Sequence, residues 1–537
     1  MKYRSRSSLL SAAATLLCST AFASSPAMTA DADVDSKIDA GLDQPDRTYP
    51  VFVRMTDQLI RGAGDYERFC EENRQARRTE LRRGVLATLH RNSDGSWQAA
   101  RELVDRLTSN GQVTNFERFW IVNGFACDAT GAACQQLAAH DAVSFVYQQR
   151  GPIRQHTRQP TPDGLPAEQQ KQVYAQVLAD WKDDSDEPFS TDGLEIPWNV
   201  DRIGAPAAWF EGQATGRGVT VALCDSGMMV APALVRALWK NPGEQLNAKD
   251  DDGNGYIDDL FGYDFQARSF YALGDSATLP HGSMCAGIVA GRPINSQKLV
   301  TGIAPRARLM ILRGMGHLKA YEYALEQGAD VLSMSYMWVN VELGNYRGVY
   351  RTAHEHLAAG GVVAVGGAGN FAALPRGRQI ALPKDIPCVI AAGGILQDGG
   401  KAPQSSEGPC FWQGVKFYDD YPAAAPLGKP DVTGLFGGYP VWARPAPLGP
   451  RWQLVSKEGP NFALVIGPQG NSFSGPHAAG VAALMLSANP DLTAWQTKSL
   501  MEQTCKDLGD PGRDHTFGAG LLQALPAVQA ARKLKKS

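Results

Sequence analysis

An apolar run that ends on an acidic residue sets the fold class of this chain. From residue 218 to residue 227 it is Gly218-Val219-Thr220-Val221-Ala222-Leu223-Cys224-Asp225-Ser226-Gly227. A short run that is apolar at nearly every position indicates a strand buried on both faces of a sheet. An ionised Asp at the end of such a strand is costly unless donors satisfy it, so Asp225 is expected to have a partner. Taken alone, an acid at this place is more often a loop cap.

Four further apolar runs follow the same pattern in the second half of the chain. They lie at residues 308–312, 331–336, 362–365 and 389–392, and stretches with helical spacing separate them. Strands that alternate with helices in this way form parallel sheets covered on both faces. We therefore predict an α/β domain over residues 196–533, with a mostly parallel central sheet between two helical layers.

A histidine opens a segment that is rich in small residues. The segment is His281-Gly282-Ser283-Met284-Cys285-Ala286-Gly287-Ile288-Val289-Ala290-Gly291. Small residues at helical spacing create two faces that other backbones can approach closely, although each Gly costs about 1 kcal/mol of helix stability relative to Ala. We predict a tightly packed helix that begins at His281. A lone histidine is more often structural, but this context favours a functional one.

A serine lies near the start of a second segment that is rich in small residues. It is Gly470-Asn471-Ser472-Phe473-Ser474-Gly475-Pro476-His477-Ala478-Ala479-Gly480. Pro476 is tolerated within the first turn of a helix, where its missing N–H costs little. Ser472 would then lie where free backbone N–H groups and the helix dipole favour a developing anion. The simpler interpretation is a capping serine.

An amide follows the strand predicted at residues 362–365. The strand runs into the loop Gly366-Gly367-Ala368-Gly369-Asn370. The Asn370 side chain can donate an N–H to the oxyanion of a tetrahedral intermediate. A turn-forming Asn is the alternative.

Together these four segments resemble the subtilisin-like serine peptidase family, whose triad follows the chain order Asp, His, Ser. The resemblance covers nearly all of residues 197–524 and includes Trp198-Asn199-Val200-Asp201-Arg202-Ile203, Gly302-Ile303-Ala304-Pro305, Lys429-Pro430-Asp431-Val432 and Phe517-Gly518-Ala519-Gly520-Leu521. It implies a serine endopeptidase in which Ser472 attacks, His281 takes the proton and Asp225 orients the imidazole. Asn370 and the Ser472 backbone N–H would hold the oxyanion.

The resemblance also implies where substrate binds. The segment Leu332-Ser333-Met334-Ser335-Tyr336-Met337 is similar to the substrate-binding strand of the family, and the residues implied around the cleaved bond are Ser335, Tyr336, Met337, Gly367, Ala368 and Gly369. Three departures stand out: Asn471 replaces the usual Thr, Met284-Cys285 replaces the common His-Val, and Met337 replaces the usual Gly. The residues at the first two of these places supply neither the attacking group nor the proton-transferring group, so activity is expected to survive. The longer side chain of Met337 is expected to narrow the pocket.

Four segments are predicted ahead of this domain. A basic start, a short apolar stretch and Ala21-Phe22-Ala23 predict a cleaved signal peptide at residues 1–23, and therefore export to the periplasm or the medium. Residues 24–47 have the composition of a disordered stretch. Residues 48–150 form a small α+β unit, and residues 151–195 form an exposed polar linker in which self-cleavage is expected.

The small unit has strands predicted at residues 50–55, 120–126 and 143–147, and helices at residues 99–107 and 132–139. It resembles the inhibitory propeptide of the family through Val51-Phe52-Val53 and Val122-Asn123-Gly124-Phe125-Ala126. The resemblance implies an intramolecular inhibitor that is cut away on maturation. A separate binding module is the alternative.

An acidic loop predicts a Ca²⁺ site. Its sequence is Asp250-Asp251-Asp252-Gly253-Asn254-Gly255-Tyr256-Ile257-Asp258-Asp259. Oxygen ligands at alternate positions with a turn-forming Gly suit Ca²⁺, and the expected ligands are Asp250, Asp252, Asn254, Tyr256 and Asp258. The loop is similar to the first nine positions of an EF-hand, but Phe261 stands where the final acid should be. A solvated acidic loop is the alternative.

Composition excludes several classes of protein. A formal net charge of -3 gives no reason to invoke nucleic acid. The apolar runs after the N-terminus are too short for a polytopic membrane protein. We expect a monomer without stable membrane association, whose partners are protein or peptide substrates and its own propeptide.

The nine cysteines agree only in part with export. Five of them follow residue 150, so at least one thiol there is unpaired or pairs outside that region. Cys388 with Cys410 is a possible bridge. Cys224 and Cys285 are expected to be small buried hydrophobic residues.

Other functions explain the motifs less well. An inert peptide-binding pseudoprotease would be expected to lack a triad member, and none is missing. The sedolisins resemble this family but have Glu in place of His281 and Asp in place of Asn370. An α/β-hydrolase needs Gly-x-Ser-x-Gly and a different chain order. A purely structural role leaves the motifs unexplained.

Overall fold

The computed structural model of the chain describes residues 34–151, 164–184, 187–275, 279–293, 298–445, 452–457 and 462–534. The expected signal peptide, the start of the stretch predicted to be disordered and residues 152–163 of the predicted linker lie outside this part of the chain.

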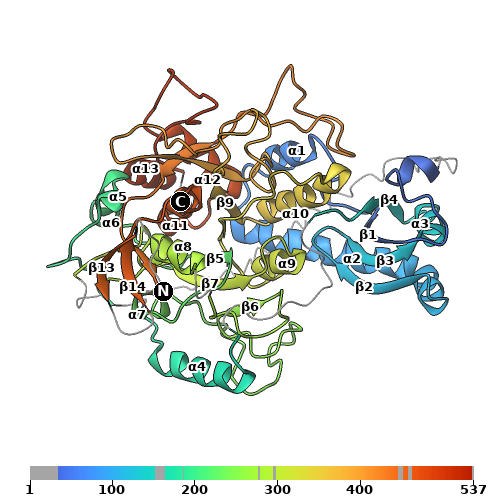
Figure 1. The fold of residues 1–537 in the computed structure, drawn as a ribbon, viewed down its shortest axis with the longest axis horizontal. Helices are drawn as coiled ribbons and strands as arrows, with labels where there is room; N and C mark the ends of the chain where they lie inside the picture. Colours follow the sequence, from blue (N-terminus) through green and yellow to red (C-terminus); the bar gives the residue numbers. More distant parts are fainter. Residues whose placement is uncertain are drawn as a thin grey trace, which may run out of the picture.

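A seven-stranded sheet forms the centre of the larger unit (Figure 1). Its strands are β5 (Thr220–Asp225), β6 (Gly262–Asp264), β7 (Arg308–Arg313), β8 (Val331–Met334), β9 (Val363–Gly367), β10 (Ile390–Ile395) and β11 (Val432–Leu435). Their order is β11-β10-β9-β8-β5-β7-β6, and each neighbouring pair is parallel. The five predicted runs are confirmed as strands. β6 and β11 were not predicted because they are too short to show a pattern.

Helices cover both faces of this sheet, which makes three layers. Along β5, Val221 and Leu223 belong to one apolar core, and Ala222 and Cys224 belong to the other. The helices that contribute to the first core include α5 (Trp198–Arg202), α6 (Ala205–Phe210), α7 (Pro232–Val235), α8 (His281–Ala290), α11 (Asn471–Ala488), α12 (Ala494–Gln503) and α13 (Ala524–Lys533). Those of the second core include α9 (Leu318–Glu326), η2 (Gly344–Tyr346) and α10 (Arg347–Ala359). The predicted fold class is therefore confirmed.

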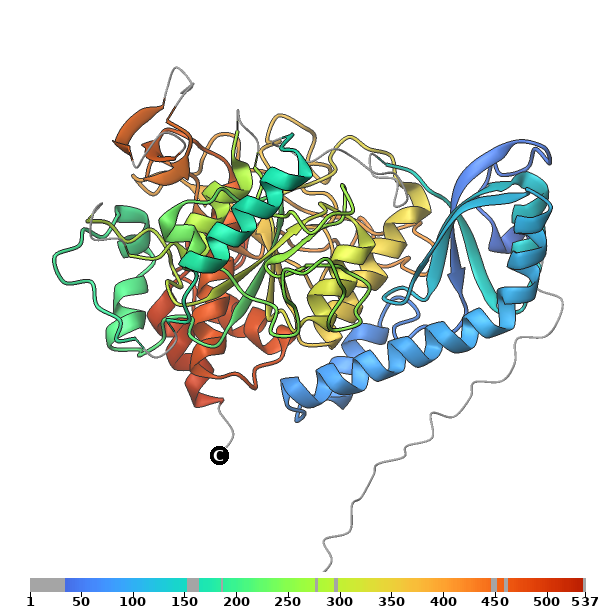
Figure 2. The ribbon, with the colours of Figure 1, turned by 90° about the horizontal axis from the view of Figure 1, so that it is seen from below.

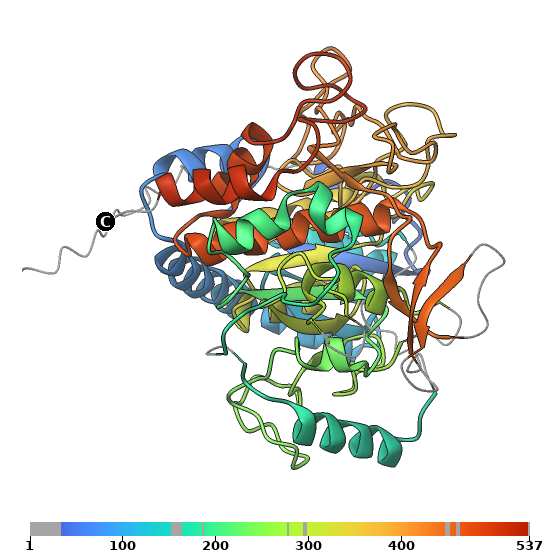
Figure 3. The same cartoon turned by 90° about the vertical axis from the view of Figure 1, so that its left-hand side faces the viewer.

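A small antiparallel ribbon projects from the larger unit (Figure 3). It has the order β12-β14-β13 and consists of β12 (Val441–Ala443), β13 (Gln453–Lys457) and β14 (Ala463–Ile466). Trp442 of β12 packs so closely on α8 that a Cβ at Gly287 would stand 2.5 Å from its ring. The sequence patterns did not predict this ribbon.

The smaller unit at the N-terminal end is an α+β structure (Figure 2). Its four-stranded antiparallel sheet has the order β2-β3-β1-β4 and is built from β1 (Thr48–Met55), β2 (Val113–Phe119), β3 (Gly124–Thr130) and β4 (Val143–Gln148). Its helical segments are η1 (Val34–Lys37), α1 (Asp65–Glu72), α2 (Arg78–Ser109) and α3 (Gly131–Ala138). The strand predicted at residues 120–126 is wrong in its first half, because residues 120–123 form a turn. The helix predicted at residues 99–107 is only the last part of the 32-residue α2.

Two segments predicted to be unstructured are packed where the structure describes them. η1 and the buried Leu42 lie within residues 34–47, so the expected disorder is wrong for that part. In the linker, α4 (Ala167–Asp180) buries Tyr174, whose hydroxyl donates to the Phe270 carbonyl at 2.6 Å. Asp184 is buried and pairs with Arg292 and Arg308 at 3.2 and 2.9 Å. Over residues 164–184 the linker is therefore anchored by a few buried side chains, while most of its other residues are exposed as expected.

The cysteines of the described residues are all free thiols. The possible bridge between Cys388 and Cys410 is therefore wrong. Cys410 instead packs in a small apolar cluster with Ala368, Ile380 and Ala391. No helix among the described residues has both the length and the apolar character needed to span a bilayer.

Candidate active site

The predicted site residues meet at the carboxyl edge of the central sheet. β5 ends at Asp225, α8 begins at His281, and Ser472 is the second residue of α11. β7 and β8 lie on opposite sides of β5, so the chain switches direction across the sheet at this strand. Such a switch point is where parallel sheets commonly form a ligand-binding crevice. The tertiary structure thus brings three distant segments to one edge.

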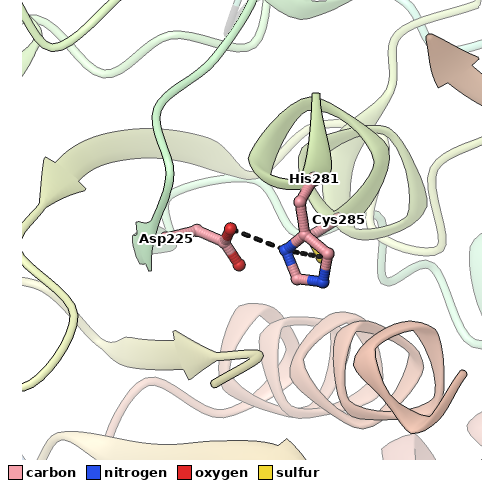
Figure 4. A group of neighbouring side chains, drawn as sticks. All are labelled: Asp225, His281 and Cys285. Carbon is pink, nitrogen blue, oxygen red and sulfur yellow. Dashed lines mark hydrogen bonds and ion pairs between the residues drawn. The ribbon is translucent and has the colours of Figure 1, made fainter. Parts of the chain in front are cut away.

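Asp225 and His281 are joined by a hydrogen bond (Figure 4). His281 Nδ1 lies 2.7 Å from Asp225 Oδ1, which also accepts the Ser226 backbone N–H at 2.8 Å. The carboxylate is 1% exposed, and the imidazole is 23% exposed. The other ring nitrogen faces the side on which α11 lies in Figure 4, so it is available to a group at the start of that helix.

Asp225 and His281 each stabilise the charged form of the other. Burial disfavours the charge on His281, but the Asp225 carboxylate outweighs it and raises the imidazole pKa well above its usual value. Burial likewise opposes the charge on Asp225, and His281 reverses this and lowers the carboxyl pKa. Cys285 Sγ lies 3.9 Å from His281 Nδ1, but burial raises the pKa of this thiol, so it is neutral. Asp225 is therefore the partner that holds the imidazole.

A second buried carboxylate ties the end of β5 to the start of α8. Asp275 accepts the Ser226 hydroxyl at 2.7 Å and the Ser283 backbone N–H at 2.9 Å. Ser226 Oγ in turn accepts the Gly282 N–H at 3.0 Å. The elements approach so closely that a Cβ at Gly282 would stand 2.0 Å from the Gly227 carbonyl oxygen. Sequence reasoning missed Asp275, although the serines on either side of it lie inside the two quoted motifs.

Pro476 leaves the Ser472 carbonyl free for other donors. α11 begins at Asn471, so Pro476 lies in its second turn, not in the first turn as predicted. A proline has no N–H to give to the carbonyl four residues earlier, which is that of Ser472. The Ser335 hydroxyl donates to it instead at 2.7 Å, and the Cys285 thiol lies 3.4 Å away. These contacts fix the backbone of Ser472 against β8 and α8.

The Asn370 amide is oriented by the first turn of α11. Its Oδ1 accepts the Asn471 N–H at 2.8 Å, which leaves the NH₂ group to face elsewhere. Asn471 is fully buried and donates through Nδ2 to the Gly369 carbonyl at 2.7 Å and to Ser405 Oγ at 3.0 Å. Asn471 thus does more than replace a Thr, because it joins the helix to the loop that carries Asn370. Asn370 itself is exposed, as contact with a ligand requires.

The expected substrate-binding residues follow the ends of two adjacent parallel strands, β8 and β9. β8 ends at Met334, so Ser335, Tyr336 and Met337 continue outside the sheet rather than within it. Gly367 ends β9 and is followed by Ala368 and Gly369. The Lys384 ammonium donates to the Tyr336 carbonyl, and burial lowers the pKa of this lysine to about 7.

The acidic loop brings together only part of the predicted Ca²⁺ ligand set. Ligand atoms of Asp250 and Asp252 lie within 4.8 Å of one another and of Glu244, which was not predicted. The Asp258 carboxylate instead accepts the N–H groups of residues 247 and 248, and the Tyr256 ring packs against other aromatic rings. Asn254 Nδ2 lies 3.2 and 2.8 Å from the carboxylates of Asp252 and Asp259. A set of three carboxylates has the hard oxygen chemistry that Ca²⁺ prefers.

Comparison with known proteins gives matches over the larger unit and beyond it. A family model described as "Subtilase family" matches residues 216–520. The chain is 24% identical over 473 residues to Bacillopeptidase F of Bacillus subtilis (strain 168), which covers 84% of this chain and 29% of that protein. It is 25% identical over 348 residues to subtilisin E of the same organism, with 62% and 71% covered. The chain therefore spans less than a third of the length of Bacillopeptidase F.

One solved structure is also similar. It is MycP1 with its N-terminal propeptide removed, at 23% sequence identity and a TM-score of 0.43. The match covers 62% of this chain and 98% of that one.

Proposed function

This chain belongs to the subtilase family, and we propose that it is a secreted serine endopeptidase with Asp225, His281 and Ser472 as its catalytic triad. The observation that carries the proposal is the 2.7 Å hydrogen bond between Asp225 and His281 at the sheet edge where α11 begins with Ser472.

The reaction follows from the positions of these groups. Ser472 Oγ attacks the scissile carbonyl carbon while His281 Nε2 takes its proton, which later passes to the leaving amine. Asp225 holds the Nδ1–H side of the ring and stabilises the imidazolium. The Asn370 NH₂ group and the Ser472 backbone N–H receive the oxyanion. The hydrogen bonds of Ser226 and Ser283 to Asp275 keep the end of β5 and the start of α8 fixed relative to each other during these steps.

The experiment compares the wild type with Ser472→Ala in casein hydrolysis and in labelling by a fluorophosphonate, which reacts only with an activated serine. Ser499→Ala is the matched control, because Ser499 is exposed on α12. We expect Ser472→Ala to lose at least about 10⁴-fold in kcat and all labelling, as triad variants do, while Ser499→Ala keeps both. If all three proteins are equally inert and unlabelled even after limited proteolysis of the linker, the chain is the peptide-binding pseudoprotease instead.

The N-terminal unit is the second part of the proposal: an inhibitory propeptide that makes the chain a zymogen. The unit lies against α9 and α10 (Figure 2), and polar contacts with these two helices support this role. The Ile121 N–H donates to Glu322 Oε1 at 3.1 Å, and the Ile60 N–H donates to His356 Nε2 at 3.0 Å. An ion pair between the largely buried side chains of Arg78 and Asp330 adds to them. These contacts hold the unit on the helical face of the catalytic domain.

Maturation would be self-cleavage between residues 151 and 163. The packing of Tyr174 and Asp184 argues against cleavage between residues 164 and 184, since a peptide bond there would have to leave its contacts to reach Ser472. Mass spectrometry of the purified protein should therefore give a new N-terminus in this range for the wild type and none for Ser472→Ala. A mature N-terminus after residue 164 would contradict this placement. Recovery of the wild type from the periplasm or medium, without residues 1–23, would test export.

A structural Ca²⁺ held by Glu244, Asp250 and Asp252 completes the proposal. Ca²⁺ at about 100 times its Kd would stabilise Ser472→Ala by about 3 kcal/mol. Thermal unfolding with and without Ca²⁺ measures this, and Glu244→Gln should reduce the effect. Asp251→Asn is the control, because Asp251 is exposed and lies outside the cluster. An equal Ca²⁺ response in all variants would exclude this ligand set.

A further inference from the structure

The segments that follow β8 and β9 and the segment around Ala381 lie next to one another and would form the walls of the substrate pocket. Gly369 follows β9 and forms the first wall. The segment that contains Ile380 and Ala381 forms the second wall. Next to it, Ala368, Ile380, Ala391 and Cys410 form a buried apolar cluster. A side chain of a bound peptide that enters between these walls would be the one that precedes the cleaved bond, if the proposed function holds.

The side chain of Met337 already occupies this space. Its sulfur accepts the Ala381 N–H at 3.4 Å, and a Cβ at Gly369 would stand 3.0 Å from the same sulfur. Met337 is half-buried and packs against the cluster of Ala368, Ile380, Ala391 and Cys410. The thioether therefore spans from one wall to the other.

The backbone around Met337 is held on both sides, so the residue cannot withdraw by a shift of the chain alone. The Trp338 N–H donates to the Leu382 carbonyl at 3.0 Å. On the other side, the buried Lys384 ammonium donates to the Tyr336 carbonyl and lies 4.9 Å from the centre of the Tyr336 ring. A large ligand side chain would have to displace the methionine itself, with loss of its apolar contacts and of the contact to Ala381.

We propose that Met337 closes the pocket for the residue preceding the cleaved bond and restricts cleavage to bonds that follow Gly, Ala or Ser. The inference rests on the proposed function and names its substrate class. A small side chain ends before the thioether and leaves it in place. A Leu or Phe side chain needs the volume that the thioether fills, and a flexible methionine yields this volume only at the cost of its packing.

The first test measures kcat/KM for tetrapeptide p-nitroanilides that differ only in the last residue, Ala or Phe. One buried methylene already changes such ratios by roughly 10 to 200-fold, so we expect the wild type to prefer Ala by about 100-fold or more. Met337→Gly should raise kcat/KM for Phe at least tenfold with little change for Ala. Met337→Leu keeps the volume and should keep the preference for Ala. Equal rates for Ala and Phe in the wild type, or an unchanged ratio in Met337→Gly, would overturn the proposal.

A second test does not depend on catalysis. Calorimetry measures the Kd of product-like peptides ending in Ala or Phe for Ser472→Ala and for Ser472→Ala/Met337→Gly. Because neither protein can remove its own inhibitor, the linker is first cut by limited proteolysis and the N-terminal unit is separated. We expect the Phe peptide to bind at least tenfold more tightly to the double variant, and the Ala peptide to bind equally to both. If the ratio of the Kd values for the Phe and Ala peptides differs between the two variants while the wild type hydrolyses nothing, the pocket inference stands and the proposed function fails. If Ser472→Ala binds the Phe peptide as tightly as the double variant does, or fails to bind the Ala peptide, the inference fails.

Discussion

A buried histidine should make the contact between the two units sensitive to acid. His356 of α10 accepts the Ile60 N–H through Nε2, and its Nδ1 lies 2.5 Å from the Ile121 carbonyl oxygen, to which it donates. Both partners belong to the N-terminal unit, and both bonds are formed by the neutral ring. Protonation would place a second N–H against the N–H of Ile60, so the charged form does not fit.

The magnitude follows from the pKa of His356. Burial lowers it from 6.5 to about 4, the nearby charge of Arg54 acts in the same direction, and the bond to Ile121 opposes both. Because the pKa in the folded state lies below that of the unfolded chain, this contribution to stability is present above pH 6.5 and is lost as the pH falls toward 4. One pKa unit corresponds to about 1.4 kcal/mol, so the loss is about 3 kcal/mol.

The assay uses Ser472→Ala, so that no self-cleavage occurs, and compares it with Ser472→Ala/His356→Gln. Urea unfolding and hydrogen exchange of the peptide that contains Ile60 are followed between pH 7 and pH 4. Gln can form both hydrogen bonds but takes no proton, so the double variant should lose about 3 kcal/mol less over this range. His354 and His477, whose pKa values burial also lowers to about 4, contribute equally to both proteins.

The control is His140→Gln, which replaces another half-buried histidine of the N-terminal unit. The ion pair of His90 with Glu326 has the opposite effect on the pH dependence of stability, since the hydrogen bond to Glu326 raises the His90 pKa. Both side chains of this ion pair are more than 40% exposed, so it offsets little of the stability that is lost at His356. Parallel pH profiles for Ser472→Ala and the His356 variant would refute the reasoning.

Three further predictions concern catalysis and the contact between the units. Asn370→Ala should lower kcat by roughly 10²- to 10³-fold, as loss of one oxyanion donor does, and a loss below tenfold in peptide hydrolysis would remove Asn370 from that role. Because Asp225 raises the pKa of His281, kcat/KM should rise with pH through a midpoint above 6.5, and a midpoint below 6.5 in a pH profile would contradict this pair. Arg78→Ala should destabilise Ser472→Ala by about 3 kcal/mol in urea unfolding, because it leaves the Asp330 carboxylate buried without its main partner. Arg78→Ala in an Asp330→Asn background should cost clearly less, and equal costs would show that the ion pair contributes nothing.

The sequence predicted elements well where one local pattern decides them. The strand that ends at Asp225 is buried on both faces, so its apolar run is continuous, and the small-residue segments that begin near His281 and Ser472 are helices as predicted. Predictions failed where distant contacts decide. In α2, Val85 and Leu89 pack into the core of the larger unit and Val104 packs into the core of the smaller one, so no single stripe marks the helix. Residues 120–123, of which the first three are apolar, form a turn whose carbonyls at positions 122 and 123 accept the side chain of Gln58.

The sequence by itself determined the fold class and which residues could do chemistry, because strand burial and helix starts are properties of neighbouring residues. Only the tertiary structure decided which distant residues meet. It set Asp275 beside Ser226, next to Asp225, and directed the Met337 side chain toward Gly369 and Ala381. The physical reason is that these contacts join segments separated by strand crossovers. The order of strands in the sheet fixes such distances, and no local pattern of residues encodes that order.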